Sequence, residues 1–230
     1  MKTHRIAAVL LLSILACLLA ADKEPKQHRY TSDGTRTDKV TQIAIGDDDD
    51  SAQVRDAKTI SGWIEQAMKA RTPQNRRRAI TTLDLIAVEA KEANEPIPER
   101  DVMAAGLVKA LSDKDSEVRS AAITALETAG TDASTSGLAK VLQSDSDDLN
   151  RMYAAAALGN LKATPSIRAL ETAARSKAQK EHVRRAAIAS LGKIGGEQAK
   201  AALGGIAKIV PAELSDDVDK ALDQVEGLAK

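Results

Sequence analysis

Three arginines recur at a fixed spacing and are the first side chains in this sequence that could act together. Arg119, Arg151 and Arg184 are separated by 32 and 33 residues. A row of guanidinium groups could bind an anion, because each group presents several donors to a phosphate or carboxylate. Asp115 and Asp147 each stand four residues before an arginine, in the acid-first order that favours ion pairs along a helix. We therefore expect the arginines to tie helices to turns, and we rank an anion site second.

The sequence offers few groups for catalysis or metal binding. After the first few residues the only histidines are His28 and His182, and they do not share a helix face, which argues against a zinc site of the usual kind. His182 as a general base would need a nucleophile and an orienting acid, and no motif such as G-x-S-x-G supplies them. The run Asp47–Asp50 lacks the spacing of a calcium-binding loop and is expected to be a solvated acidic segment. We predict no catalytic residues, no metal site and no cofactor.

The amino terminus is typical of an export signal. A basic start is followed by an apolar run over residues 6–21, shorter than the about 20 residues of a bilayer span. Cleavage before Asp22 is predicted; the alternative is that residues 14–17 form a bacterial lipobox, in which Cys17 is lipidated. No other stretch is apolar enough to cross a membrane. We expect an exported protein, periplasmic or secreted, anchored to the envelope only if Cys17 carries lipid.

Composition favours an all-α fold and disfavours nucleic acid as a partner. Lys plus Arg equals Asp plus Glu at 33 each, so no basic excess exists to neutralise a phosphate backbone. Aromatic residues make up 1% of the chain, with Trp63 the single tryptophan and no phenylalanine. A core without rings must be built from Ala, Leu, Ile and Val, which suit closely packed helices better than a sheet.

The chain divides into a signal over residues 1–21, a spacer over 22–50 and a helical domain over 51–230. The spacer is polar and predicted to be flexible, apart from a short extended piece at Val40–Ile45. From Ser51 onward, regular start and stop signals predict about ten helices.

An internal repeat determines the predicted fold. VRSAAITAL from Val118, NRMYAAAAL from Asn150 and VRRAAIASL from Val183 align without gaps, and RRRAITTL from Arg76 is a weaker copy followed by an insertion. A two-helix unit cannot bury its apolar face alone, so such units must stack. Two sets of apolar residues are predicted to lie inside the stack, leucines between the layers and alanines where helices meet: Leu126, Leu158 and Leu191, with Ala122, Ala154 and Ala187.

VRSAAITAL, NRMYAAAALGNL and VRRAAIASLGKIG resemble HEAT repeats, specifically the short HEAT-like type also found in phycobilisome lyases. The resemblance covers roughly Thr72 to the C terminus. It implies a right-handed α-α superhelix of about five antiparallel helix pairs, whose concave side often holds another protein. Lyase activity toward bilins is disfavoured, because an exported protein would not meet that substrate and the repeat alone does not carry the reaction.

Two rows of residues that the repeat turns outward are the candidate partner-binding positions. One row is Arg77, Ser120, Met152 and Arg185; the other is Glu117, Leu149 and His182. If Leu149 and Met152 are exposed, they would form an apolar anchor beside charged groups. The alternative is that both are buried against the adjacent helix.

We predict an exported, non-catalytic scaffold of the cell envelope that binds another protein. Two alternatives stay open. One is an accessory subunit or lyase-like enzyme built on the same repeats, and the other is an envelope protein that buffers calcium through the acidic run.

Overall fold

The computed structural model describes residues 59–228, most of which belong to ten α-helices. The helices are α3 (Ile60–Lys69), α4 (Pro73–Glu92), α5 (Arg100–Ala110), α6 (Ser116–Ala129), α7 (Thr135–Ser144), α8 (Asp148–Asn160), α9 (Ile167–Arg175), α10 (Glu181–Ile194), α11 (Gly196–Ala207) and α12 (Ser215–Leu228). Short 3-10 turns precede α7, α9 and α12 at Asp132–Ser134, Thr164–Ser166 and Ala212–Leu214. This part of the chain contains no strand. The signal, the spacer, Cys17 and the run Asp47–Asp50 lie outside the described residues, so what the sequence predicts for them stays a prediction.

Short-range signals determine where the helices begin and end. The Thr72 side chain accepts a hydrogen bond from a first-turn amide of α4, and Pro73 occupies the first helical position, where its missing N–H does no harm. Asp115 and Asp147 cap α6 and α8 in the same way, through amides of their first turns. Gly195 ends α10 with a φ of 69°, which only glycine adopts without strain.

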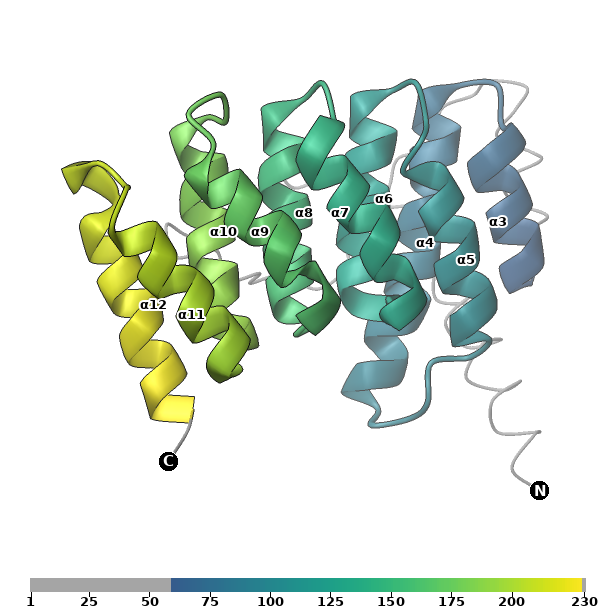
Figure 1. The fold of residues 1–230 in the computed structure, drawn as a ribbon. Coiled ribbons are helices and arrows are strands. Elements are labelled where there is room, and N and C mark those ends of the chain that lie inside the picture. Colours follow the sequence, from purple (N-terminus) through teal and green to yellow (C-terminus); the bar gives the residue numbers. More distant parts are fainter. Residues whose placement is uncertain (1–58, 229–230) are drawn as a thin grey trace, which may run out of the picture. The chain divides into compact units, whose positions relative to one another are not determined.

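The helices form two layers (Figure 1). α3, α5, α7, α9 and α11 lie side by side in the layer nearer the viewer, and we call this the odd layer. α4, α6, α8, α10 and α12 form the even layer behind it, in which each helix packs against its neighbours and against the odd-layer helix that precedes it. The arrangement is an α-solenoid, which confirms the predicted fold of about five helix pairs.

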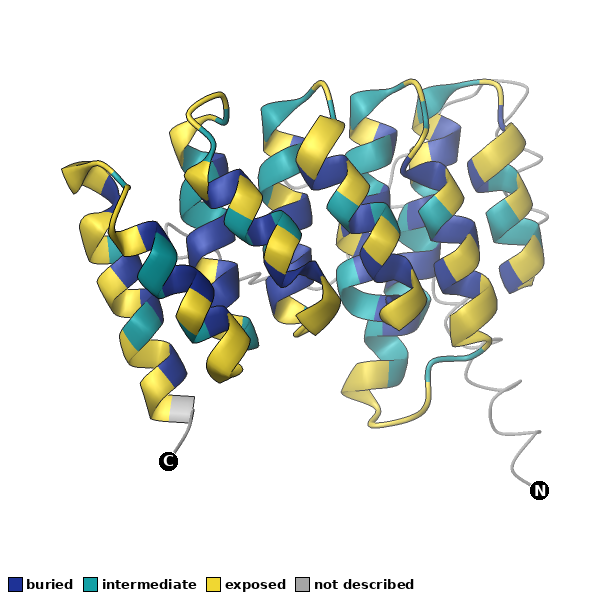
Figure 2. Cartoon of the chain, viewed as in Figure 1, coloured by how far each residue is buried: buried dark blue, intermediate teal, exposed yellow. Residues whose placement is uncertain are grey.

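The core lies between the two layers and continues from the first pair to the last (Figure 2). It consists of Ala, Leu, Ile and Val with Met103, and both repeated sets, the three leucines and the three alanines, are fully buried. No aromatic ring of the described residues is fully buried: Trp63 only packs against the core, and Tyr153 is exposed. Small side chains therefore let the helices approach closely.

Close approach is most pronounced between α8 and α10. A Cβ atom added at Gly159 would lie 2.6 Å from the Oγ and 2.8 Å from the Cα of Ser190. The Ser190 hydroxyl donates to the carbonyl oxygen of Ala155 at 2.8 Å, so the same contact also satisfies a buried polar group. Between α10 and α12, a Cβ at Gly192 would lie 3.0 Å from the Cα of Ala221. These contacts depend on the absence of a side chain.

The insertion after the first repeat lengthens one helix and one loop. α4 has 20 residues, whereas α6 has 14. The loop ends at Arg100, whose Nε donates to the carbonyl oxygen of Ala129 at 3.2 Å and whose Nη2 donates to that of Gly130. The insertion is thus fastened to the end of α6. None of the helices described combines the length and apolar character that a bilayer crossing requires.

Candidate functional site

The register arginines have a structural role. Arg119 donates from Nε and Nη2 to the two carboxylate oxygens of Asp145, at 2.8 and 2.7 Å, and from Nη1 to the carbonyl oxygen of Asp113 at 3.0 Å. The side chains of the Arg119–Asp145 pair are only 11% and 3% exposed. Burial by itself would raise the pKa of Asp145, but hydrogen bonds from Arg119 and the amide of Asp147 hold that pKa below its ordinary value. Arg119 therefore links α6 to the turn before α8 and is not presented to an anion.

The same link occurs one repeat earlier. Arg76 donates from Nε and Nη2 to Asp113 at 2.7 and 2.9 Å, and from Nη1 to the carbonyl oxygen of Ala70 at 3.0 Å. Burial by itself would raise the pKa of Asp113. The hydrogen bonds from Arg76 and from the amide of Asp115 have a larger combined effect, so that pKa lies below its ordinary value. Two successive repeats are thus joined by buried bidentate ion pairs.

Later repeats keep the arginine but change its partner. Arg151 Nε donates to the side-chain oxygen of Gln179 at 2.8 Å, and its Nη1 donates to the carbonyl oxygen of Asp145 at 2.6 Å. Arg184 Nε donates to the carbonyl oxygen of Ala174 at 2.9 Å. Along the chain, the partner of the register arginine is thus a carboxylate for Arg76 and Arg119, a side-chain amide for Arg151 and a backbone carbonyl for Arg184.

The predicted arginine partners were wrong. Asp115 and Asp147 do not pair with Arg119 and Arg151, because each carboxylate turns toward the free amides of its own helix start and caps them. The acidic partners come from the following repeat, at Asp113 for Arg76 and Asp145 for Arg119. Both aspartates stand two residues before a capping aspartate, and this recurring Asp-x-Asp spacing is the signal that could have found them.

The candidate partner-binding residues lie on the outward side of the even layer, near the starts of its helices. Most of the charged members already bond between neighbouring helices. Arg77 of α4 pairs with Glu117 of α6, and His182 Nε2 of α10 lies 3.3 Å from a carboxylate oxygen of Asp148 of α8. Arg185 of α10 donates to Glu181 at 2.7 Å and to Asp217 of α12. Ser120 is half-buried among them.

A second polar row crosses the same side of the layer near the helix ends. Asn160 of α8 donates to Glu127 of α6 at 2.5 Å, and Lys193 of α10 donates to Asn160 at 2.7 Å. Two polar rows thus border the outward side of α6, α8 and α10.

Between the polar rows lies an apolar patch on α8. We define the α8 patch as Leu149, Met152, Tyr153 and Ala156. Leu149 is 48% and Tyr153 41% exposed, whereas Met152 is half-buried against the core. The neighbouring helices present only small side chains at this level: Ser120, Ala121 and Thr124 on α6, and Ala186 and Ala189 on α10. Of the predicted anchor pair, Leu149 is exposed and Met152 packs inward; Tyr153 was missed, although it follows Met152 directly.

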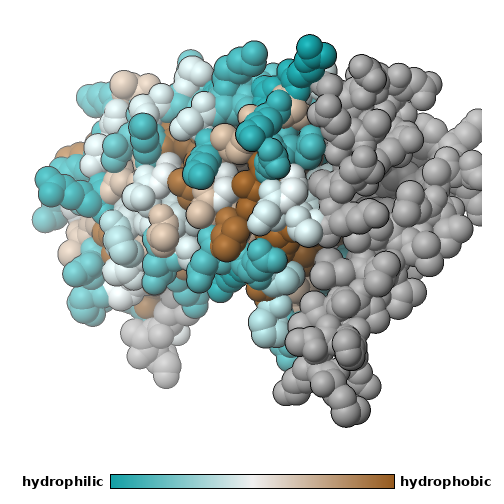
Figure 3. All heavy atoms as spheres, turned by 90° about the vertical axis from the view of Figure 1, so that its right-hand side faces the viewer, coloured by the Kyte–Doolittle hydropathy of each residue, from teal (hydrophilic) through white to brown (hydrophobic). Residues whose placement is uncertain are grey.

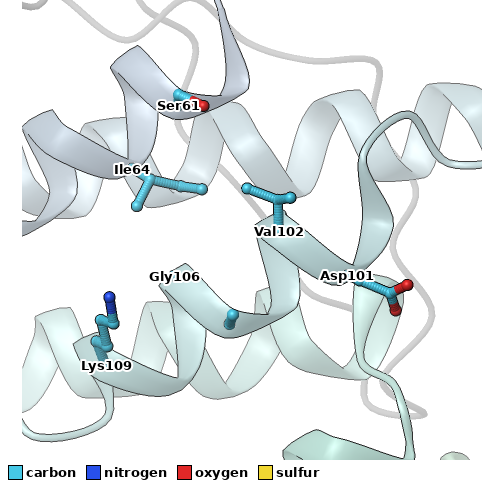
Figure 4. Close-up of a pocket in the computed structure, with 7 residues that line it drawn as sticks. Ser61, Ile64, Asp101, Val102, Gly106 and Lys109 are labelled. Carbon is cyan, nitrogen blue, oxygen red and sulfur yellow. The ribbon is translucent and has the colours of Figure 1, made fainter.

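A groove opens on the opposite layer, between α3 and α5. It has a volume of about 430 Å³ and is lined by Ser61, Ile64, Asp101, Val102, Ala105, Gly106 and Lys109. Ile64 and Val102 point toward each other across it (Figure 4), and hydrophobic side chains gather at this end of the stack (Figure 3). Asp101 and Lys109 are its titratable groups, eight residues apart on α5 and hence about 12 Å apart along the axis. The groove does not bring acid and base together.

A smaller groove of about 260 Å³ lies beside the turn after α6 and is lined by Arg100, Gly130, Thr131, Asp132, Thr135 and Leu161. Its arginine is already bonded to backbone carbonyls. The described residues contain no cluster of three or more metal-ligating side chains. His182 and Asp148 line neither groove.

Comparisons with known proteins agree with this architecture. The family model of HEAT repeats matches residues 60–158 and 135–212. Human deoxyhypusine hydroxylase, solved with glycerol, is similar in structure with a TM-score of 0.51 and 21% identity over 76% of each chain. An engineered protein matches with a TM-score of 0.49 and 19% identity, over 73% of this chain and 79% of its own. A designed armadillo repeat protein matches with a TM-score of 0.47 and 20% identity, over 72% and 82%. No curated protein sequence matches the chain. The repeat register, the two-layer stack and the matched family model together show that this chain belongs to the HEAT-repeat family.

Proposed function

We propose that this protein is an exported, non-catalytic scaffold of the cell envelope that binds another protein on the outward side of the even layer. The observation that carries the proposal is the α8 patch. Leu149, Met152 and Tyr153 lie at the centre of the outward side of the even layer. One polar row borders this patch near the helix starts and the other near the helix ends. Protein interfaces have this organisation, with aromatic and methionine side chains at the centre and a polar rim.

The neighbours of the patch support binding of a large partner. Ser120, Thr124 and Ala189 are small, so the side chains of Leu149 and Tyr153 stand above their surroundings. A partner could enclose both side chains without first displacing bulky groups. HEAT repeats build extended surfaces of this kind from stacked helices.

The positions of the titratable groups among residues 59–228 support the proposed absence of catalysis. In the larger groove the charged groups Asp101 and Lys109 are far apart, and in the smaller groove Arg100, which lies beside Asp132, is bonded to backbone carbonyls. His182 and Asp148 are close but sit on the open face of the layer. A general base usually acts within an enclosed site that shapes the substrate.

The test is capture of partners with matched variants. The mature protein would be used as bait against the exported fraction, beside Leu149→Asp and Ile209→Asp. Both residues are 48% exposed, but Ile209 follows α11 at the far end of the odd layer. A protein retained by the wild type and by Ile209→Asp, and lost by Leu149→Asp, supports the proposed face. Equal retention by all three chains would contradict it.

Export itself is tested by the mass of the purified native protein. A chain beginning at Asp22 supports ordinary signal cleavage, and a lipid-bearing chain beginning at Cys17 supports envelope anchoring. Finding the uncleaved chain in the cytoplasm would refute export.

A further inference from the structure

The geometry points to a second copy of this chain as a partner of the even layer, in a dimer whose two-fold axis runs along α8. This inference rests on the proposed function, because it names the partner of the same face. Among the described helices, α8 is the middle one of the five in that layer, so an axis along it lets these two sets of five helices overlap fully. Such an axis lays α6 of one copy over α10 of the other and α4 over α12, with helix starts meeting helix starts.

The first argument is the order of charges across the layer. α6 carries the acidic residues Glu117 and Glu127, and its only basic residue, Arg119, is used inside the stack. α10 carries Arg185 near its start and Lys193 near its end, and its one acidic residue, Glu181, is bonded to Arg185. The proposed axis therefore places an acidic helix over a basic one, twice in each dimer.

The repeat register places these charges at matching heights. Glu117 and His182 both stand two residues before a register arginine, so the axis brings one over the other. Glu127 stands eight residues after a register arginine and Lys193 stands nine after one. Their heights therefore differ by only one residue rise, about 1.5 Å, which a long lysine side chain can span. The bonds within each chain leave room for these contacts, since the side chain of Glu117 is 71% exposed.

The outer helices of the layer follow the same rule. Arg77 lies on the first turns of α4, and Asp216 and Asp217 lie on the first turn of α12. Among these side chains near the helix starts, the order from α4 to α12 is thus basic (Arg77), acidic (Glu117), apolar (Leu149), basic (Arg185) and acidic (Asp216 and Asp217). A two-fold axis through the middle of that order pairs opposite charges on both sides, whereas a shift by one helix would superpose like charges on at least one helix pair.

The α8 patch lies on the axis itself. Leu149, Met152, Tyr153 and Ala156 have the three- and four-residue spacing of a helix seam, so two parallel copies of α8 can pack along it. Met152 and Tyr153 lie on opposite flanks of that seam, because they are adjacent in a helix. The two-fold operation sets Met152 of one copy against Tyr153 of the other, a favourable sulfur–aromatic contact.

The size of the face suits a stable dimer. Five helices spaced by about 10 Å span about 40 Å, and helices of this length measure about 20 Å. The face therefore offers roughly 800 Å² per copy, which is the area that each partner buries in a standard protein interface.

The first experiment measures oligomeric state by sedimentation equilibrium on the mature chain and on two charge-reversed chains. One carries Glu117→Lys and Glu127→Lys, and the other carries Arg185→Glu and Lys193→Glu. Each variant alone should dimerise at least about tenfold more weakly than the wild type, because α6 and α10 then carry the same sign. An equimolar mixture should recover the dimer as a heterodimer, because the signs are opposite again. Thermal melts of each variant check that it folds.

The second experiment locates the axis with single cysteines introduced into the chain from Asp22 to Lys230, which contains no cysteine of its own. Ala156→Cys should form a disulfide-linked dimer under mild oxidation, because the axis brings the two copies of that residue together. Ala201→Cys, exposed on α11 in the odd layer, is the matched control and should stay monomeric. Equal cross-linking of both, or a mixture of charge-reversed chains that stays monomeric, overturns the inference.

Sedimentation and partner capture separate this inference from the proposed function. A wild-type chain that is monomeric at every concentration, yet loses a captured protein on Leu149→Asp, refutes the dimer and leaves the scaffold standing. A monomer that captures nothing through this face refutes both.

Discussion

The two halves of the even layer are held together by different chemistry. From α4 to α8, buried arginine–aspartate pairs join successive repeats through Arg76–Asp113 and Arg119–Asp145. From α8 to α12 the same register arginines find only an amide or a backbone carbonyl, and glycines let the helices touch. The first half thus relies on buried ion pairs across a turn, whereas the second relies more on close packing, because its ion pair between α10 and α12, Arg185–Asp217, is partly exposed.

This difference shows what a repeat register does and does not determine. The register fixes where an arginine and a leucine stand, so both halves share one fold. It does not fix the partner of the arginine, because that partner belongs to a turn whose sequence changes from repeat to repeat. A helical repeat can lose its ion pair and keep its stack when small residues allow closer packing.

The largest effect is expected where the ion pair is most buried. Asp145→Ala leaves the guanidinium of Arg119 buried without its carboxylate, which should lower the free energy of unfolding by about 3–5 kcal/mol. Urea denaturation measures this. Asp132→Ala, an exposed aspartate of the turn before α7, is the control and should change stability by less than about 0.5 kcal/mol. A loss of under about 1 kcal/mol at Asp145 would mean that packing alone holds the first half.

The second half should be most sensitive to added volume. Gly159→Ala places a methyl group against the Cα of Ser190, so it should destabilise the protein by about 1–3 kcal/mol despite the better helix propensity of alanine. Gly204→Ala in α11 meets nothing within 4 Å and should stabilise by about 0.5–1 kcal/mol. If close packing governs this half, thermal unfolding should show a lower melting temperature for Gly159→Ala and a higher one for Gly204→Ala than for the wild type. Two changes of the same sign would contradict that view.

A smaller effect is expected from the capping aspartates. Asp147→Ala removes the acceptor for the amide of Leu149 and should cost about 1 kcal/mol, since the rest of the helix start stays solvated. Comparing it with Asp145→Ala by urea denaturation separates two carboxylates that stand two residues apart. If both changes cost the same, the distinction between cap and ion pair is wrong.

The smallest change in folding stability should come from lowering the pH. Asp113 and Asp145 have pKa values lowered below the ordinary value of 3.8, so the stability that they contribute is present above that value and is lost as pH falls through the lowered pKa. Urea midpoints measured from pH 6 to pH 3 should therefore fall less in Asp113→Asn/Asp145→Asn than in the wild type. A variant that loses stability with the same pH dependence would show that other carboxylates control the acid response.

The fold could be predicted from the sequence because its evidence is periodic and local. Three copies of one segment imply a stack, and a composition almost free of aromatic residues implies close helices. The caps at Thr72 and Asp115 follow from residues within four positions of the helix start. Thr164-Pro165 has the same residue types as Thr72-Pro73, but it forms a 3-10 turn before α9 and does not cap an α-helix. The two candidate rows lie near the helix starts of the even layer, and their role in binding stays a prediction.

The contacts of those rows could not be predicted, since they join residues far apart in the chain. Arg185 and Asp217 are 32 residues apart, and Arg76 and Asp113 are 37 apart. No spacing within one helix reveals such a pair. The role of Met152 depends on the direction of its side chain, which the spacing of residues leaves open.

The paired aspartates of the turns have a consequence for where this protein can change in length. In the turn before α8, Asp145 holds the preceding repeat and Asp147 begins the next helix, so one added residue would disturb both. The connection from α4 to α5 carries no such pair and already contains an insertion. One rim of the stack is thus fixed in length and the other can vary. A reporter or an additional binding loop would best be grafted between α4 and α5, where growth leaves the joints between repeats intact.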